Sequence, residues 1–114
     1  MIHIVGRHIV VEAPDAAWRS EAIDLGRDNG AVCTVTVIAS DDFGVVPELW
    51  GSNRRSQGFS WLAAAAIEVL QVGESVTVQA APVGTRYVQL RFGVAGTGKG
   101  DRIVVAARLE TYRA

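Results

Sequence analysis

Two stretches of alternating hydrophobicity in the last third of the chain place the strongest limit on its fold. In the first stretch, polar or amphipathic residues alternate with Val88, Leu90, Phe92 and Val94. In the second, residues 103–109, an apolar row again occupies every second position, and a glycine-rich segment joins the two stretches. Alternation at period two is typical of β-strands with one buried face. We therefore expect a long antiparallel hairpin with both apolar rows facing the core.

The register of this hairpin follows from burial of the two rows. A register that places Phe92 opposite Val105, for example, puts both rows on one face and sets Leu90 opposite Ala107. A slip of one residue would turn one row to water. This interpretation predicts that the two strands are neighbours in one sheet.

Other stretches of the chain carry similar signals, and turn residues separate them. Alternating or β-branched residues predict strands at residues 7–12, 21–25, 31–39, 45–50 and 74–80. The strand at 31–39 is dense in β-branched residues and favours a central position, whereas Pro47, which has no N–H, indicates an edge strand. Residues 59–70 are ambiguous, because the alanines favour a helix and the length also allows a strand followed by a turn. We favour the strand and turn.

The number and spacing of these strands indicate the fold class. About eight short strands with turns between them predict an all-β protein, an antiparallel jelly roll or β-sandwich. A length of 114 residues fits a single domain. Within this domain, residues 1–12 are expected to form either an N-terminal strand or a docking arm.

Composition excludes several classes of partner. Charged residues make up 20% of the chain and the formal net charge is -1, so no basic surface for nucleic acid is indicated. No apolar run reaches the roughly 18 residues that span a bilayer, and the N-terminus lacks the pattern of a signal peptide. We therefore expect no nucleic acid and no membrane as partner. The single cysteine, Cys33, lies in a β-branched stretch, where a buried thiol is expected instead of a reactive one.

A glycine-rich motif at residues 93–100, GVAGTGKG, copies part of a phosphate-binding loop. Such a loop needs a Ser or Thr hydroxyl where this chain has Gly100, and a helix where this chain continues with a predicted strand. We therefore interpret the glycines as a hairpin tip and expect no nucleotide site.

Other residue sets also fall short of a catalytic or metal site. His3 and His8 are the only histidines, too few for the His-rich centre of a cupin enzyme. Asp28, Asp41 and Asp42 lie in predicted turns, where acidic side chains usually bond their own backbone. No histidine accompanies a serine in a nucleophile motif. The sequence predicts a protein that is not an enzyme and holds no cofactor or metal.

The remaining candidates for function are surface residues. Aromatic side chains occur at predicted strand ends or beside loops, at Trp18, Trp50, Phe59 and Trp61. Such side chains are either core plugs or interface anchors, because they combine a large apolar area with few rotatable bonds. Arg54 and Arg55 belong to a polar loop, either as a solvated tip or as a docking clamp.

Three short motifs carry a resemblance to a known family. They are AIDLG at residues 22–26, the Gly73 turn before Val76 and Val78, and Pro82 followed by RYVQLRFGVAGT at residues 86–97. Together with the order of strands over residues 20–109, they resemble the capsid cement, or decoration, proteins of tailed bacteriophages. The similarity is to the family described from a Bordetella phage and related podophages. Residues 1–18 and 50–61 depart from that pattern.

The resemblance implies a function as well as a fold. It implies a jelly-roll protein, made in the bacterial cytoplasm, that binds the exterior of the virion capsid and bridges neighbouring major capsid subunits. It also implies a homo-dimer or homo-trimer on the capsid, with contacts anchored by aromatic side chains and the N-terminal arm. The candidate contact residues are Ile2, Ile4, Trp18, Trp50, Arg54, Arg55 and Trp61.

A second hypothesis comes from a different class of protein. A small carbohydrate-binding β-sandwich would use Trp18, Trp50 or Trp61 as a platform on which a sugar ring stacks. This hypothesis requires at least one of these tryptophans to be exposed.

Overall fold

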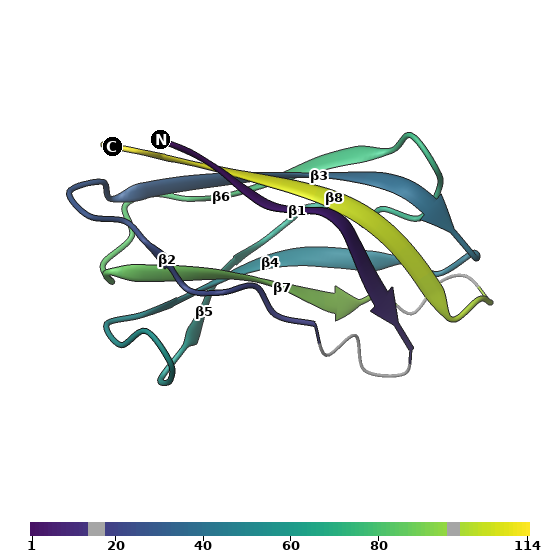
Figure 1. Cartoon of the computed structure of the whole chain (residues 1–114), viewed down its shortest axis with the longest axis horizontal. Helices are drawn as coiled ribbons and strands as arrows, with labels where there is room; N and C mark the ends of the chain where they lie inside the picture. Colours follow the sequence, from purple (N-terminus) through teal and green to yellow (C-terminus); the bar gives the residue numbers. More distant parts are fainter. Residues whose placement is uncertain (14–17, 96–98) are drawn as a thin grey trace.

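The computed structural model describes residues 1–13, 18–95 and 99–114, and it consists of two β-sheets packed face to face (Figure 1). Within these residues there is no helix, and the chain forms a single domain of eight strands. The strands are β1 (Ile2–Glu12), β2 (Ile23–Asp24), β3 (Gly30–Ser40), β4 (Val45–Ser52), β5 (Ser60–Ala64), β6 (Ser75–Ala80), β7 (Tyr87–Val94) and β8 (Arg102–Tyr112). The predicted all-β fold class is confirmed.

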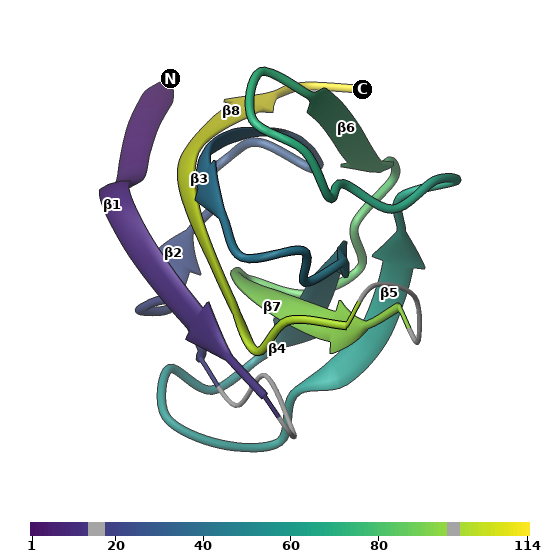
Figure 2. The same cartoon turned by 90° about the vertical axis from the view of Figure 1, so that its right-hand side faces the viewer.

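The strand order identifies the architecture as a jelly roll. One sheet has the order β1-β8-β3-β6 and the other has the order β2-β7-β4-β5. The described strands pair in antiparallel fashion, β1 with β8, β2 with β7, β3 with β6 and β4 with β5. These nested pairs arise when one long antiparallel ribbon is wound into a two-sheet sandwich. Figure 2, which looks along the long axis, shows β1 at the outer edge of its sheet.

The expected hairpin of residues 81–112 is wrong, although both of its strands exist. β7 pairs with β4 and β2, whereas β8 pairs with β1 and β3, so the two strands lie in different sheets. Val105 lies between Ile9 and Val37 and not opposite Phe92. Alternation fixes which face of a strand is buried but not which strand lies beside it. Two apolar rows that face one core can therefore do so from opposite sheets.

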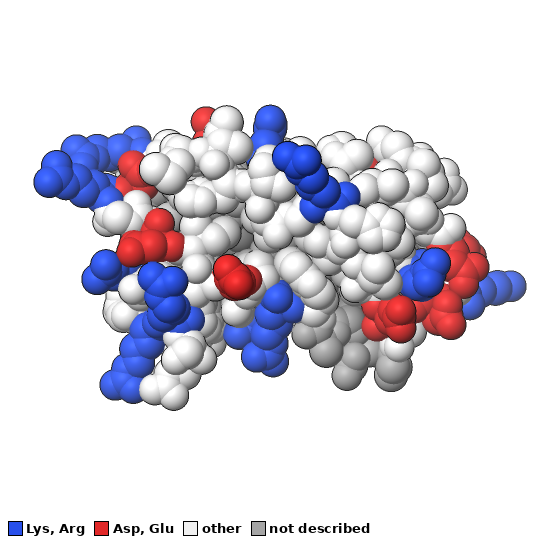
Figure 3. Space-filling model, viewed as in Figure 1, with Lys and Arg blue, Asp and Glu red and all other residues white. Residues whose placement is uncertain are grey.

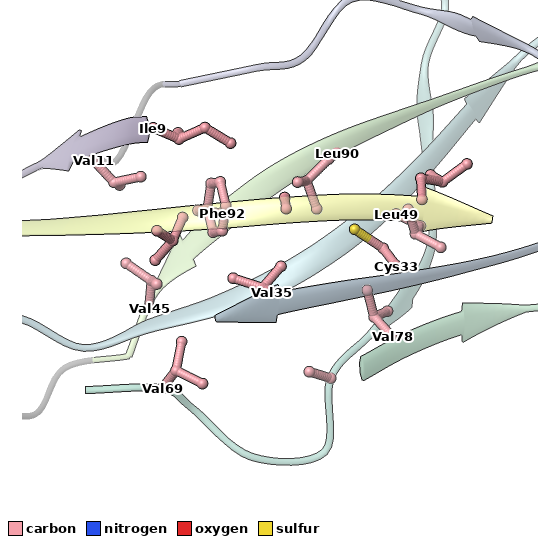
Figure 4. Close-up of a cluster of buried hydrophobic side chains, with 14 of the residues drawn as sticks. Ile9, Val11, Cys33, Val35, Val45, Leu49, Val69, Val78, Leu90 and Phe92 are labelled. Atoms are coloured by element: carbon pink, nitrogen blue, oxygen red, sulfur yellow. The ribbon is translucent and has the colours of Figure 1, made fainter. Parts of the chain in front are cut away.

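The core lies between the sheets and contains both predicted apolar rows. From β7, Leu90 and Phe92 are 0% and 5% exposed, and from β8 Ile103 is 0% exposed. Side chains from both sheets meet in this layer, with Cys33 among them (Figure 4). Val94 was expected in the buried row but is 44% exposed, because it is the last residue of β7, where the strand leaves the sandwich.

Pro47 lies in an internal strand, so the predicted edge position of this strand is wrong. β4 pairs with β7 on one side and with β5 on the other. The pairing with β5 begins at Glu48, and the Pro47 carbonyl accepts a hydrogen bond from the Ala65 N–H at 2.9 Å. The missing N–H of the proline therefore points to a place where β5 has already ended, and it breaks no bond of either ladder.

The remaining segments agree with the sequence-based expectations. β3 is internal, between β8 and β6, and residues 59–70 form β5 followed by bends. Residues 2–12 form a strand whose pairing register shifts on both sides of Gly6. One predicted feature, the glycine-rich tip at 93–100, includes residues 96–98, which lie outside the described part of the chain, as do residues 14–17.

Candidate functional site

Two exposed surfaces contain the residues singled out by the sequence. The first is the outer face of the β2-β7-β4-β5 sheet, here named the aromatic–arginine face and defined by Trp50, Arg54, Arg55, Phe59, Trp61, Tyr87 and Arg91. The second is the β1 groove, defined by the edge strand β1 and residues 18–24. Ile2, Ile4 and Trp18 lie on or beside this groove, so the seven candidate contact residues do not form a single site.

Trp50 and Trp61 are cross-strand neighbours on the aromatic–arginine face. Trp50 pairs with Trp61 across β4 and β5, and residues directly opposite in an antiparallel pair point to the same side of the sheet. Leu49 is fully buried in the core, so the adjacent Trp50 points outward. Trp50 is half-buried, whereas Trp61 is 55% exposed. Trp61 therefore presents its indole to solvent.

The Arg91 guanidinium holds Trp50 in place. Its Cζ lies 4.3 Å from the centroid of the Trp50 ring and 5.7 Å from that of Phe59, within the range of cation–π contacts. The Arg91 Nε donates to Gln89 Oε1 at 2.8 Å, and the Trp50 Nε1 donates to Glu48 Oε1 at 3.1 Å. Burial lowers the pKa of Arg91. This part of the face is therefore ordered before any partner binds.

Hydrogen bonds also order the loop that carries Arg54 and Arg55. The Ser52 hydroxyl donates to the Gln57 carbonyl and accepts a bond from the Arg54 N–H at 3.0 Å. The Arg55 Cζ lies 5.2 Å from the centroid of the Tyr87 ring. Both arginines are exposed, so they place positive charge beside the aromatic rings.

Arginines gather at one end of the molecule, the end that carries both termini (Figure 3). The loops and the C-terminal segment at this end contribute Arg27, Arg54, Arg55, Arg86 and Arg113. Arg86 forms an exposed ion pair with Asp24 at 3.2 Å, which raises the pKa of Arg86 and lowers that of Asp24. A group of acidic side chains lies at the opposite end (Figure 3). The charges are therefore unevenly distributed along the long axis, although some acidic side chains lie near the arginine end and some basic ones near the acidic end (Figure 3).

The β1 groove is an open cavity of about 530 Å³ between β1 and residues 18–24. Its lining includes His3, Ile4, Trp18, Ser20 and Ile23. The Trp18 ring packs against Phe92 with 5.6 Å between centroids, so this tryptophan belongs to the wall of the core. Ile2 and Ile4, in contrast, are 57% and 55% exposed at the edge of the sheet.

His3 lines this groove, but its Nε2 is buried and has no hydrogen-bond partner among the described residues. Buried polar atoms in native proteins are nearly always paired, so this nitrogen is an exception. A lone histidine in a predicted strand does not indicate such an exception.

The side chains considered as metal ligands or as a reactive thiol are either far apart or buried. Asp28 accepts a bond from the Thr111 hydroxyl, whereas the Asp41 N–H donates to the Arg102 carbonyl, so these aspartates lie at opposite ends of β8. Burial raises the pKa of the Cys33 thiol to about 12. In residues 1–13, 18–95 and 99–114, no three His, Cys, Asp or Glu side chains are grouped to bind a metal ion. No helix in these ranges has the length and apolar character needed to cross a membrane.

Two comparisons with known protein sequences return no match for this chain. No protein-family model matches it, and no curated protein sequence matches it. Its function is therefore argued from its motifs and from the two surfaces.

Arg91 and Tyr87 were missed as candidate contact residues. Arg91 lies on the polar side of a predicted strand, which indicated only that it faces outward. Its stacking on Trp50 depends on the pairing of β7 with β4, which no local pattern reveals. The Arg55 contact with Tyr87 likewise joins segments that are distant in sequence.

Proposed function

We propose that this chain is a structural virion protein that binds the outside of a tailed-phage capsid, bridges major capsid subunits and stabilises the shell without catalysis. The observation that carries the proposal is the exposed Trp61 beside the ordered Trp50 and Arg91 pair. Trp, Tyr and Arg dominate binding energy at protein interfaces, and order before binding reduces the entropy lost on association. The motifs that resemble those of cement proteins indicate that the partner is a major capsid subunit.

The architecture suits this role. A jelly roll presents rigid faces, and viral capsid proteins are among those built on it, although a fold alone does not determine function. A protein that binds the assembled lattice, and not free subunits, stabilises the shell by mass action. A specific contact needs about 1,000 Å² of buried surface in total. We expect the protein to be made in the host cytoplasm and to self-associate as a dimer or trimer on the capsid exterior.

Purified phage heads that lack the protein test the proposal. Wild-type protein should sediment with the heads and add density to their outer surface in cryo-electron microscopy. Trp61→Ala should weaken binding by about 2 kcal/mol, or about 30-fold in affinity, because it removes the exposed anchor. The measurement is the fraction bound as a function of protein concentration.

Ile67→Ala is the matched control for this experiment. Ile67 is 65% exposed but lies in the connection between β5 and β6, away from the tryptophan pair. The Ile67→Ala variant should bind heads with the same affinity as the wild type. Wild-type protein that never sediments with heads would overturn the proposal, and full binding by Trp61→Ala would show that the anchor lies on another surface.

A carbohydrate-binding module is the second candidate function, and the exposure of Trp61 favours it. An exposed indole beside a second tryptophan on a sheet face can stack on a sugar ring. We rank this function second because Arg54 and Arg55 flank the rings, and arginine suits carboxylates on a protein surface better than neutral sugars. Glycan-array binding that is lost in Trp61→Ala would reverse the ranking. If the protein binds no glycan on the array, the carbohydrate-binding function is excluded.

A further inference from the structure

The first residues of β1 form an open sheet edge. β1 is the outermost strand of its sheet, beside β8. Met1 exchanges both backbone hydrogen bonds with Thr111, each at 2.8 Å. Bonded and non-bonded pairs alternate in an antiparallel ladder, so the N–H and C=O groups of Ile2 and Ile4 point away from β8. Among the described residues, no strand pairs with this side of β1.

This edge borders the β1 groove. His3 and Val5 contribute to one wall of the groove, and Trp18 and Ile23 contribute to the other. Its volume of about 530 Å³ lies within the usual range of ligand pockets, roughly 300 to 1,000 Å³. The His3 Nε2 is buried beneath this lining, so the groove offers a partner space and not that polar atom.

Irregularities in β1 set the length of the edge. The pairing register shifts between Ile4 and Gly6 and again between Gly6 and Ile9. Such bulges bend a strand and interrupt the addition of another strand to its edge. The usable edge is therefore short and centred on residues 2–4, where the exposed side chains of Ile2 and Ile4 lie on the outer face of the sheet.

We propose that residues 2–4 accept an extended segment of a partner protein as an additional strand, and that this segment places one side chain in the β1 groove. The free N–H and C=O groups of Ile2 and Ile4 bond its backbone, as in β-strand addition generally. Its outward apolar side chains pack on these two isoleucines. The strand addition itself does not depend on the proposed function. Only the claim that a subunit of the capsid shell supplies the segment rests on it.

A second copy of this chain fits the edge less well. Consider two copies whose β1 strands pair symmetrically about His3. The only side chains of each β1 that would face a groove are its own His3 and Val5. These side chains already line the groove of their own copy, so the cavity would stay unfilled.

A peptide-display library tests the proposal without phage heads. The probe is a library of peptides of about nine residues, in which Val, Ile or Thr alternates with randomised positions, selected on the full-length protein. Ile4→Pro removes an outward N–H without removing a bond to β8, and proline is tolerated at such positions of edge strands. Ile4→Thr keeps the N–H and is the matched control. Selected peptides should bind Ile4→Thr as they bind the wild type, and Ile4→Pro at least about tenfold more weakly.

Ala22→Trp provides a second variant that leaves the edge intact and fills the groove, which Ala22 lines. Thermal unfolding checks that each variant is folded. Selected peptides should bind Ala22→Trp at least about tenfold more weakly. They should also slow hydrogen exchange of the Ile2 and Ile4 amides. If no peptide distinguishes the wild type from the folded variants, the inference is overturned.

Phage heads then test the origin of the segment. If a shell subunit supplies it, Ile4→Pro binds heads at least about tenfold more weakly than Ile4→Thr, and both amides are protected on the heads. Equal binding of all variants to heads removes the shell as the source but leaves the proposed function intact. If selected peptides bind the protein but the protein does not bind heads, the proposed function is overturned and the inference about the β1 edge is not. Protection of the same amides by self-association, without peptide, would overturn the inference in favour of a second copy.

Discussion

Phe92→Ala should lower the free energy of unfolding by about 3 to 5 kcal/mol. Phe92 is 5% exposed on the inner face of β7, and its ring packs on Trp18. Truncation leaves a cavity between two sheets that are fixed by their hydrogen-bond ladders, so the surrounding side chains can fill it only in part. Urea unfolding followed by circular dichroism measures the change.

Val94→Ala is the matched control, because Val94 belongs to the same strand and is 44% exposed. It should change the free energy of unfolding by less than about 0.5 kcal/mol. A loss below about 1 kcal/mol for Phe92→Ala would place this ring at the surface and contradict the assignment of β7 to the inner layer.

The buried faces of the strands could be predicted from the sequence because alternation is a local property. In β7 and β8 the residues expected inward, such as Leu90 and Ile103, are fully buried. The alternation that predicts a strand at 74–80 likewise agrees with the burial of Val78 in β6. It failed for Val94, because the end of a strand is not marked by its pattern.

The partners of the strands could not be predicted in this way. A glycine-rich connection favours a hairpin between β7 and β8, but β1, β3 and β8 are each 11 residues long. By lying between β1 and β3, β8 gains a long ladder on each side, which a hairpin with the 8-residue β7 cannot supply. Gly6 divides the N-terminal stretch into two short pieces in the sequence, so the length of β1 was hidden.

The candidate site was predictable in its residue types and not in its geometry. Three tryptophans that the sequence places alike, at predicted strand ends or beside loops, have different environments: Trp18 packs on the core, Trp50 stacks with Arg91, and Trp61 is 55% exposed. Exposure depends on which strand lies alongside and on where that strand ends. The single edge of β1 likewise follows from the sheet order and from no local motif.

Raising the pH above 9 should destabilise the protein through Cys33. The ordinary pKa of this thiol is 9.0, and burial raises it to about 12 in the folded protein. Between these values the unfolded chain releases the proton while the folded chain keeps it, so deprotonation favours the unfolded state. Stability that is fully present below pH 9 is therefore lost as the pH rises, and the loss at pH 11 is about 3 kcal/mol.

Cys33→Ala isolates this effect, because the variant keeps the other titrating groups and lacks the thiol. Urea unfolding of both proteins from pH 8 to pH 11 gives two stability curves, and their difference cancels the contributions that the two proteins share. The wild-type curve should fall more steeply than that of the variant above pH 9. Parallel curves would mean that water reaches the thiol in the folded state, which is incompatible with a closed layer of side chains between the two sheets.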